Sequence, residues 1–217
     1  SVFDGFTNGP IAGATVCPMS GVADAECYTT DANGIAEMNY EPNADHVATV
    51  SAEGYVTARQ SYNVSAPEDG TIPTLVTQLF PPSGISNLVT QAEGVDAVDE
   101  TKGHALMWAN DLDGGFVSGI SFMVTPTSGV GPVYIAEGDF IQNSLAGVAY
   151  DETATATSSN GTANLINVDA GLYTTTVTHD SADCFAFSGI QNDDGTVGFD
   201  IAAGEITYVS VICTEGE

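Results

Sequence analysis

Four cysteines are the residues of this chain whose spacing most directly predicts a chemical bond. Cys17 and Cys27 lie in the first half of the 217-residue sequence, and Cys184 and Cys213 lie in the second half. Each spacing suits a bridge between neighbouring strands, and an even number of cysteines in an acidic, lysine-poor chain favours an oxidising compartment. Metal binding is the alternative, but the sequence has no Cys-x-x-Cys pair and no histidine at ligand spacing. We therefore predict the disulfides Cys17–Cys27 and Cys184–Cys213.

The side chains needed for catalysis form no recognisable pattern. The histidines are His46, His104 and His179, and the first two fall in strand patterns, where a packing role is more common than that of a general base. The sequence lacks Gly-x-Ser-x-Gly and His-Glu-x-x-His motifs, and cysteines held in disulfides cannot act as nucleophiles. Because the chain has 29 acidic residues, the presence of two carboxylates does not identify a catalytic pair. We predict no catalytic residues and no enzymatic activity.

Calcium is the one cofactor that the sequence brings into consideration. Asn110, Asp111 and Asp113 place side-chain oxygens just ahead of two glycines, as at the start of a calcium loop, and 192–195 is similar. The bidentate glutamate that closes such a loop is missing. An Asp-Gly hairpin turn explains both segments equally well, so the calcium site and the turn remain alternatives.

Two segments match the acceptor pattern for N-glycosylation. They begin at Asn63 (Asn-Val-Ser) and at Asn160 (Asn-Gly-Thr). Chance matches are expected in a chain rich in these residues, so both stay candidate sites.

The charge of the chain excludes several classes of partner. The 29 acidic residues stand against Arg59 and Lys102, which gives a formal net charge of -27. Such a chain cannot neutralise phosphate groups, so we expect no nucleic-acid partner and no binding to anionic lipids. No apolar run reaches the length of about 18 residues that suggests a membrane span, so we expect no direct membrane insertion. The chain starts at Ser1 without an apolar leader, and we expect a mature secreted form.

The elements that must position these residues are predicted to be β-strands, arranged as a repeat. Short runs of Val, Thr, Tyr and Ile alternate with Gly, Asn, Asp and Pro clusters, which is typical of an all-β sandwich. The same strand-turn-strand pattern occurs twice with equal spacing. The repeated pairs are 9–16 with 115–122, 29–38 with 156–165, and Val50 with Val177. The expected strands are 11–17, 27–30, 35–40, 46–52, 55–64 and 72–80, then 104–109, 117–125 and 205–213.

The repeat predicts two tandem domains, 1–80 and 102–217, joined by a connector over 81–101 with a short helical turn within 85–98. The second copy is longer between its repeated segments, which places an insertion at about 129–150. Insertions form loops, and loops on a rigid sandwich often carry binding function. We therefore predict an interface formed by apolar residues of the insertion, although a hairpin lengthened without consequence is the alternative. The predicted interface residues are Tyr134, Ile135, Phe140 and Ile141.

The repeated segments resemble a known domain family. The first half contains Gly-Pro-Ile-Ala-Gly-Ala-Thr-Val at 9–16, Thr-Asp-Ala-Asn-Gly at 30–34 and Val-Ser-Ala-Glu-Gly-Tyr at 50–55, which resemble a carboxypeptidase regulatory-like domain. The second half is similar at 117–119, 158–161 and 170–173. This family belongs with the transthyretin-like and collagen-adhesin B-type sandwiches. The resemblance implies two tandem Ig-like or transthyretin-like Greek-key β-sandwiches. Its members are typically non-catalytic stalks, adhesin segments or accessory modules of secreted bacterial proteins.

The adhesin branch of that family is often locked by a Lys-Asn isopeptide bond. The first half of this chain has no lysine, and the predicted closing strand 205–213 offers no Asn or Asp to Lys102. The two disulfides would then stabilise the domains instead, each by about 2 to 4 kcal/mol.

Together these features predict a secreted, non-enzymatic structural protein of a bacterial cell surface, a subunit of an appendage, filament or surface layer. Its expected partners are further copies of itself or other surface proteins. The alternative is a carbohydrate- or ligand-binding accessory or adhesion module. Trp108, the single tryptophan, lies in a predicted core strand, which counts against a sugar-binding platform.

Overall fold

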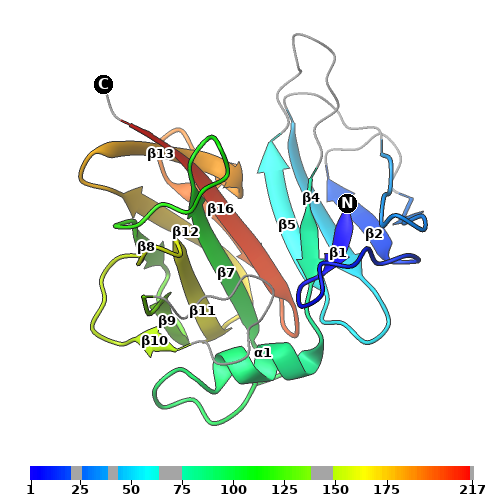
Figure 1. Cartoon of the computed structure of the whole chain (residues 1–217), viewed down its shortest axis with the longest axis horizontal. Coiled ribbons are helices and arrows are strands. Elements are labelled where there is room, and N and C mark those ends of the chain that lie inside the picture. Colours follow the sequence, from blue (N-terminus) through cyan, green and yellow to red (C-terminus); the bar gives the residue numbers. More distant parts are fainter. Residues whose placement is uncertain (21–25, 39–43, 64–74, 138–148, 216–217) are drawn as a thin grey trace.

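The computed structural model describes residues 1–20, 26–38, 44–63, 75–137 and 149–215 (Figure 1). These residues form an all-β structure with one short helix, which confirms the predicted fold class. The first half contains β1 (Val2–Asp4), β2 (Thr15–Ser20), β3 (Tyr28–Thr29), β4 (Asp45–Ser51), β5 (Ala58–Asn63) and β6 (Thr77–Leu79). The second half contains β7 (Gly103–Asn110), β8 (Ser121–Thr125), β9 (Val130–Ile135), β10 (Tyr150–Asp151), β11 (Thr162–Val168), β12 (Gly171–Thr178), β13 (Ala182–Ser188), β14 (Ile190–Gln191), β15 (Val197–Ile201) and β16 (Ile206–Glu215).

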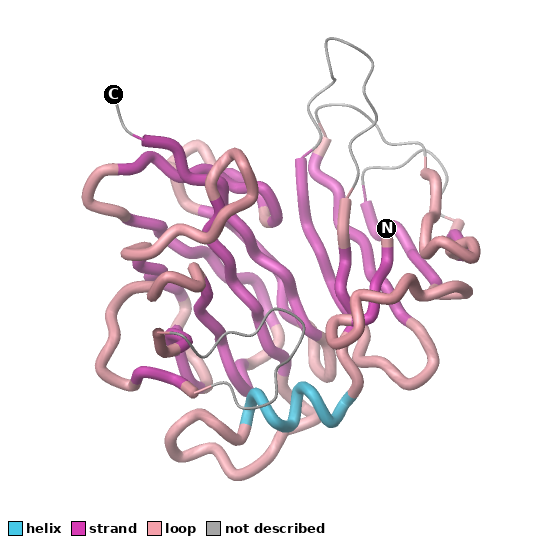
Figure 2. The backbone as a smooth tube through the Cα atoms, viewed as in Figure 1, coloured by secondary structure: helices cyan, strands magenta, loops and turns pink. Residues whose placement is uncertain are grey.

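The helix α1 (Pro82–Val89) lies between the halves, where the sequence predicts a helical turn (Figure 2). It begins at Pro82, a residue suited to the first helical position because its missing N–H would have no partner there. Its buried face carries Ile85, Leu88 and Val89. No helix in the described ranges has the length and apolar character required to cross a membrane.

The sequence repeat is a repeat of strand pairing. In the first half β2 pairs with β4, with Val16 opposite Val50, and in the second half β8 pairs with β12, with Phe122 opposite Val177. Each half also has a parallel pair, β1 with β6 and β7 with β16. The repeated segments therefore occupy the same positions in both copies.

Hydrogen bonds within the repeat are also equivalent. A buried threonine in each copy, Thr30 or Thr157, bridges two backbone groups through its hydroxyl. The hydroxyls donate to Ile11 O at 2.7 Å and Val117 O at 3.0 Å, and accept the N–H of Ala14 at 2.9 Å and of Ile120 at 3.0 Å. A glycine precedes each accepted N–H, Gly13 with φ 76° and Gly119 with φ 78°, and only glycine adopts this backbone without strain.

The second half is a two-layer sandwich. One layer has the strand order β14-β15-β12-β8, and the other contains β10, β9, β11, β7 and β16, with β13 paired to β16. The apolar core between them combines Met107 and Val209 from one layer with Phe122, Tyr173 and Phe199 from the other. All residues of this core cluster in the described ranges come from the second half.

The two halves share one sheet. The strand β5 pairs in parallel with β16 over Ala58–Gln60 and Ile206–Tyr208. The sheet of the second half therefore continues through β5, β4, β2 and β3 of the first half. Figure 1 shows β5 and β16 meeting near α1 and diverging away from it. The core of the first half includes residues from α1 and from the second half: Leu106, Val133, Ile135, Ile166, Ile206 and Tyr208. The predicted boundaries at 80 and 102 remain a prediction, and the hydrogen bonds of the sheet and the packing of this core both cross them.

One local prediction is wrong, and one local feature was not predicted. Residues 35–38, expected to begin a strand, lie outside any strand, and the equivalent segment of the second half is the long strand β11. The second half has two additional strands, β13 and β14, between β12 and β15. The first half has none at the equivalent place, where β4 leads directly to β5 in the described residues. The strand β13 leaves its own layer and pairs with β16 in the other.

Candidate functional site

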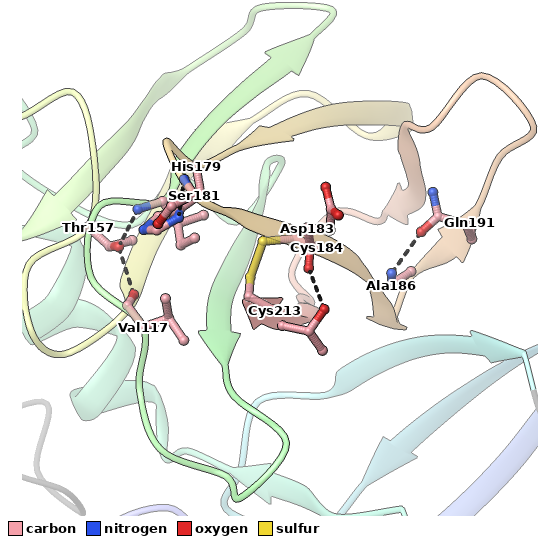
Figure 3. The surroundings of a disulfide bond; sticks show 11 residues. Val117, Thr157, His179, Ser181, Asp183, Cys184, Ala186, Gln191 and Cys213 are labelled. Atoms are coloured by element: carbon pink, nitrogen blue, oxygen red, sulfur yellow. Dashed lines mark hydrogen bonds between the residues drawn. A yellow bond between two sulfur atoms is a disulfide. The ribbon is translucent and has the colours of Figure 1, made fainter. Parts of the chain in front are cut away.

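Both predicted disulfides are present in the structure. Cys17 of β2 bonds Cys27, just before β3, and Cys184 of β13 bonds Cys213, its register partner on β16. The Cα atoms are 4.2 and 4.1 Å apart. Figure 3 shows the second disulfide joining the two strands. Each bond ties an outer strand to its neighbour. In the described part of the chain, β3 pairs only with β2 and β13 pairs only with β16.

The candidate calcium residues form a hairpin turn. The Asp111 carboxylate accepts the N–H groups of Asp113 at 2.9 Å and Gly115 at 2.7 Å, and Asn110 donates weakly to the carbonyls of the same turn. The described residues include no group of three or more His, Cys, Asp or Glu side chains placed to hold a metal ion. Asn110, Asp111 and Asp113 thus lie in the hairpin turn, and the calcium site stays a prediction.

The same turn occurs in the first half at Asp31, whose carboxylate accepts the N–H groups of Asn33 at 2.8 Å and Ile35 at 2.9 Å. These backbone hydrogen bonds, from Ile35 first and then Asn33, lower the pKa of Asp31. The same type of Asx turn therefore occurs at two places in the described part of the chain.

The candidate glycosylation site at Asn160 is wrong. This side chain is 6% exposed, and its Nδ2, the atom that would carry the sugar, donates to Ala136 O at 3.1 Å. Asn63 ends β5, and its side chain lies outside the described part of the structure.

The predicted interface in the insertion is also wrong where the structure describes it. Tyr134 is 4% and Ile135 is 1% exposed, because both belong to β9, which pairs with β11 inside the sheet. The hydroxyl of Tyr134 accepts the N–H of Phe122 on β8 at 3.0 Å. Phe140 and Ile141 lie outside the described residues. The start of the insertion is therefore part of the core rather than an exposed loop.

Two of the three histidines, His46 and His104, are buried. His104 is 2% exposed, its Nδ1 accepts the N–H of Asn167 at 3.3 Å, and its Nε2 has no hydrogen-bond partner. Burial lowers the pKa of His104 to about 4. His46 is buried and stacks on Tyr62 with ring centroids 5.5 Å apart. Both residues are packed inside the fold.

Arg59, the only arginine, fixes the halves to each other. It lies on β5 with 7% exposure, and its guanidinium contacts Asp200 and Glu205 of the second half, each at 2.8 Å. Beside it, Ile206 N–H donates to Thr57 O at 2.9 Å. A buried guanidinium requires such partners, because an unpaired charge inside a protein is strongly destabilising.

A groove of about 690 Å³ lies between the halves. Its residues come from the faces of β7, β11 and β16 and from β5, β6 and the start of the chain. Trp108, only partly buried, stacks on Tyr208 in this groove, with ring centroids 5.1 Å apart and an interplanar angle of 19°. Phe187 and Leu112, which are 51% and 75% exposed, stand at its rim.

This groove was not predicted from the sequence, because Trp108 was assigned to a core strand. The strand is a core strand, but the two faces of β7 differ: Ala105, Met107 and Ala109 face the interior of the sandwich, while Leu106 and Trp108 face the first half. All five residues of 105–109 are apolar, so the sequence did not distinguish the face of the strand inside the sandwich from the face that borders the groove.

Comparison with known proteins gives only distant similarity. No family model and no curated protein matches the chain. Among solved structures, the minor pilin GBS52 of Streptococcus agalactiae is similar over 96% of this chain and 85% of its own, with 12% identity and a TM-score of 0.34. A streptococcal ancillary pilin is similar over 88% of this chain and 51% of its own (13% identity, TM-score 0.33), so this chain spans about half of that protein. The major pilin BcpA of Bacillus cereus is similar over 99% and 98% (12% identity, TM-score 0.30). TM-scores this low do not assign a function to the chain.

Proposed function

We propose that this chain is a non-enzymatic, extracellular structural protein, a subunit of a bacterial cell-surface assembly. The observation that carries the proposal is the union of two repeats into one body. The sheet runs through both halves, and the buried guanidinium of Arg59 holds two carboxylates of the other half. A subunit that must keep its shape within an assembly benefits from such a connection, because interfaces between independent domains usually permit motion.

The last strand adds further support. β16 pairs with β7 on one side and with β5 and β13 on the other, and Cys213 near its end is bonded to Cys184. A strand paired on both sides and tied covalently is well suited to carry force along the chain. Disulfides persist outside the cytosol, which supports an extracellular location.

Assembly would need a short-range attraction, because the net charge of -27 keeps copies apart. The outer layer of the second half exposes Met123 and Leu172, which are 68% and 80% accessible. These side chains lie on neighbouring strands, since β8 pairs with β12. They are our candidate contact with a further copy or with another surface protein.

The test is light scattering of the purified chain in about 1 M sodium chloride, where the Debye length is about 3 Å, with electron microscopy of the same samples and of material shed by the native cells. We expect high-mass species or fibres, and we expect the double variant Met123→Asp, Leu172→Asp to reduce them. Leu112→Asp is the matched control, because Leu112 is 75% exposed but lies at the groove. A strictly monomeric chain in high salt, together with no assembly on the cells, contradicts the proposal.

A second candidate function is that of a ligand-binding adhesion or accessory module. The observation that favours it is the groove with its Trp108–Tyr208 stack, because ligand sites in proteins are concave and lined by aromatic side chains with a few polar groups.

A further inference from the structure

We propose that the groove between the halves binds a neutral oligosaccharide. This inference rests on the second candidate function, that of a ligand-binding module, and names its ligand class. It does not depend on the structural role, since assembly and sugar binding are measured separately. The volume of about 690 Å³ lies within the usual range for ligand sites, roughly 300 to 1,000 Å³.

The charge of the groove is the first argument. The chain has 29 acidic residues, yet Asp111 is the only acidic or basic residue lining the groove within the described part of the chain. Two backbone N–H groups already donate to its Oδ1 atom. An anionic ligand would find no cation there, and a cationic ligand would find better partners elsewhere on the surface. The groove therefore selects an uncharged ligand.

The polar groups of the groove suit hydroxyls. Five amide side chains line it, and an amide group has both donors and an acceptor. They are Asn8, Gln60, Gln78, Asn110 and Asn164. The Oδ1 atom of Asn164, a residue only 1% exposed, has no hydrogen-bond partner, while its Nδ2 donates to the Tyr150 hydroxyl at 3.1 Å. A buried acceptor left without a donor is destabilising, and a ligand hydroxyl that enters the groove beside Asn164 is a candidate donor.

The aromatic groups supply the apolar part of the site. Trp108 is supported on one side by Tyr208, which is fixed because its hydroxyl donates to Gln78 O. The C–H groups on one face of a sugar ring pack well on a rigid aromatic surface, and Trp offers the largest such area. Phe187 extends the apolar surface to the rim.

An extended peptide or a second copy fits the groove less well. Peptides commonly bind by adding a strand to a free sheet edge, but the floor strands β7 and β16 are each paired on both sides. A second copy would bring another net charge of -27 close to the first. A neutral oligosaccharide needs neither a free edge nor charge neutralisation.

The test uses Trp108, the only tryptophan, whose fluorescence reports on the groove alone. The full chain is titrated with cellohexaose, xylohexaose, mannohexaose and hexa-N-acetylchitohexaose, and with hexagalacturonate as the anionic comparison. We expect a saturable change in emission with at least one neutral oligosaccharide and none with hexagalacturonate at the same concentrations. No saturable change with any neutral oligosaccharide, or equal binding of the anionic one, overturns the proposal.

A matched pair of variants locates the binding. Phe185 and Phe187 lie two positions apart on β13 and are 45% and 51% exposed, but only Phe187 lines the groove. By calorimetry with the oligosaccharide that binds, we expect Phe187→Ala to weaken binding by about five- to tenfold and Phe185→Ala to leave it unchanged. Both side chains are exposed enough for the variants to fold, which thermal melting verifies. Equal effects of the two variants would place the binding elsewhere and overturn the proposal.

Discussion

The two halves of the chain start from the same pattern and reach different degrees of independence. Both contain the bridging threonine and the same strand pairing. The second half adds β9, β10, β11, β13 and β14 and builds a core from its own residues, whereas the core of the first half draws on α1 and on residues of the second. A repeated pattern therefore sets strand pairing, while the added strands decide which copy can bury a core alone.

The largest expected effect is on the separated halves. We expect fragment 102–217 to fold alone and fragment 1–80 to remain unfolded, because the latter loses buried neighbours such as Leu106, Ile206 and Tyr208. Far-UV circular dichroism and NMR dispersion of both fragments check this. Fragment 1–101 is the control: it retains α1 but not β7 or β16, and we expect it to stay unfolded too. A folded fragment 1–80 would show that the halves are independent domains.

Removing the charge that connects the halves should be the next largest effect. The two basic residues of the chain form a natural comparison, because Arg59 is buried between the halves while Lys102 contacts Asp169 at the surface. We expect Arg59→Met to lower the free energy of unfolding by about 3 kcal/mol, since it leaves two carboxylates without their partner. We expect Lys102→Met to cost less than about 1 kcal/mol. Urea unfolding measures both, and similar losses would contradict a special role for Arg59.

The sequence anticipated what is local or repeated. Equal spacing matched Val50 with Val177, and the structure places the two at equivalent points of their strand pairs, opposite Val16 and Phe122. The cysteines were paired from their distribution between the copies. The sequence did not anticipate the parallel pairing of β5 with β16. These strands lie far apart in the chain, and neither contains a feature that marks the other as its partner. The groove follows from that pairing, so it could not be derived either. Tyr134 and Ile135 were misplaced for a related reason: apolar residues in an insertion look the same whether they extend a core or form an exposed loop.

The buried histidine of the second half should make stability depend on pH. The pKa of His104 is about 4 in the folded chain, compared with 6.5 ordinarily. As the pH falls from about 6.5 to 4, the unfolded chain takes up a proton that the folded chain does not, so stability is lost over this range and no further below it. The loss approaches about 3 kcal/mol. Urea unfolding of the protein and of His104→Gln from about pH 7 to pH 4 isolates this contribution from the carboxylates, and a difference that stays constant with pH would contradict it.

The smallest expected effect tests the likeness of the halves rather than their difference. Thr30 and Thr157 are each 5% exposed and make the same two hydrogen bonds, one donated to a carbonyl and one accepted from an N–H. Valine keeps the shape of the side chain but removes the hydroxyl, which leaves a buried N–H and a carbonyl without their partner. We expect Thr30→Val and Thr157→Val each to lower the free energy of unfolding by about 2 kcal/mol. The two losses should agree within about 0.5 kcal/mol, because the two hydroxyls have the same burial and the same pair of hydrogen bonds. Serine at either position should restore most of the loss, since it supplies the hydroxyl again. Unequal losses would contradict the equivalence of the two sites and would mean that the packing around them differs. In that case we expect the larger loss for Thr30→Val, because the core of the first half depends on residues of the second.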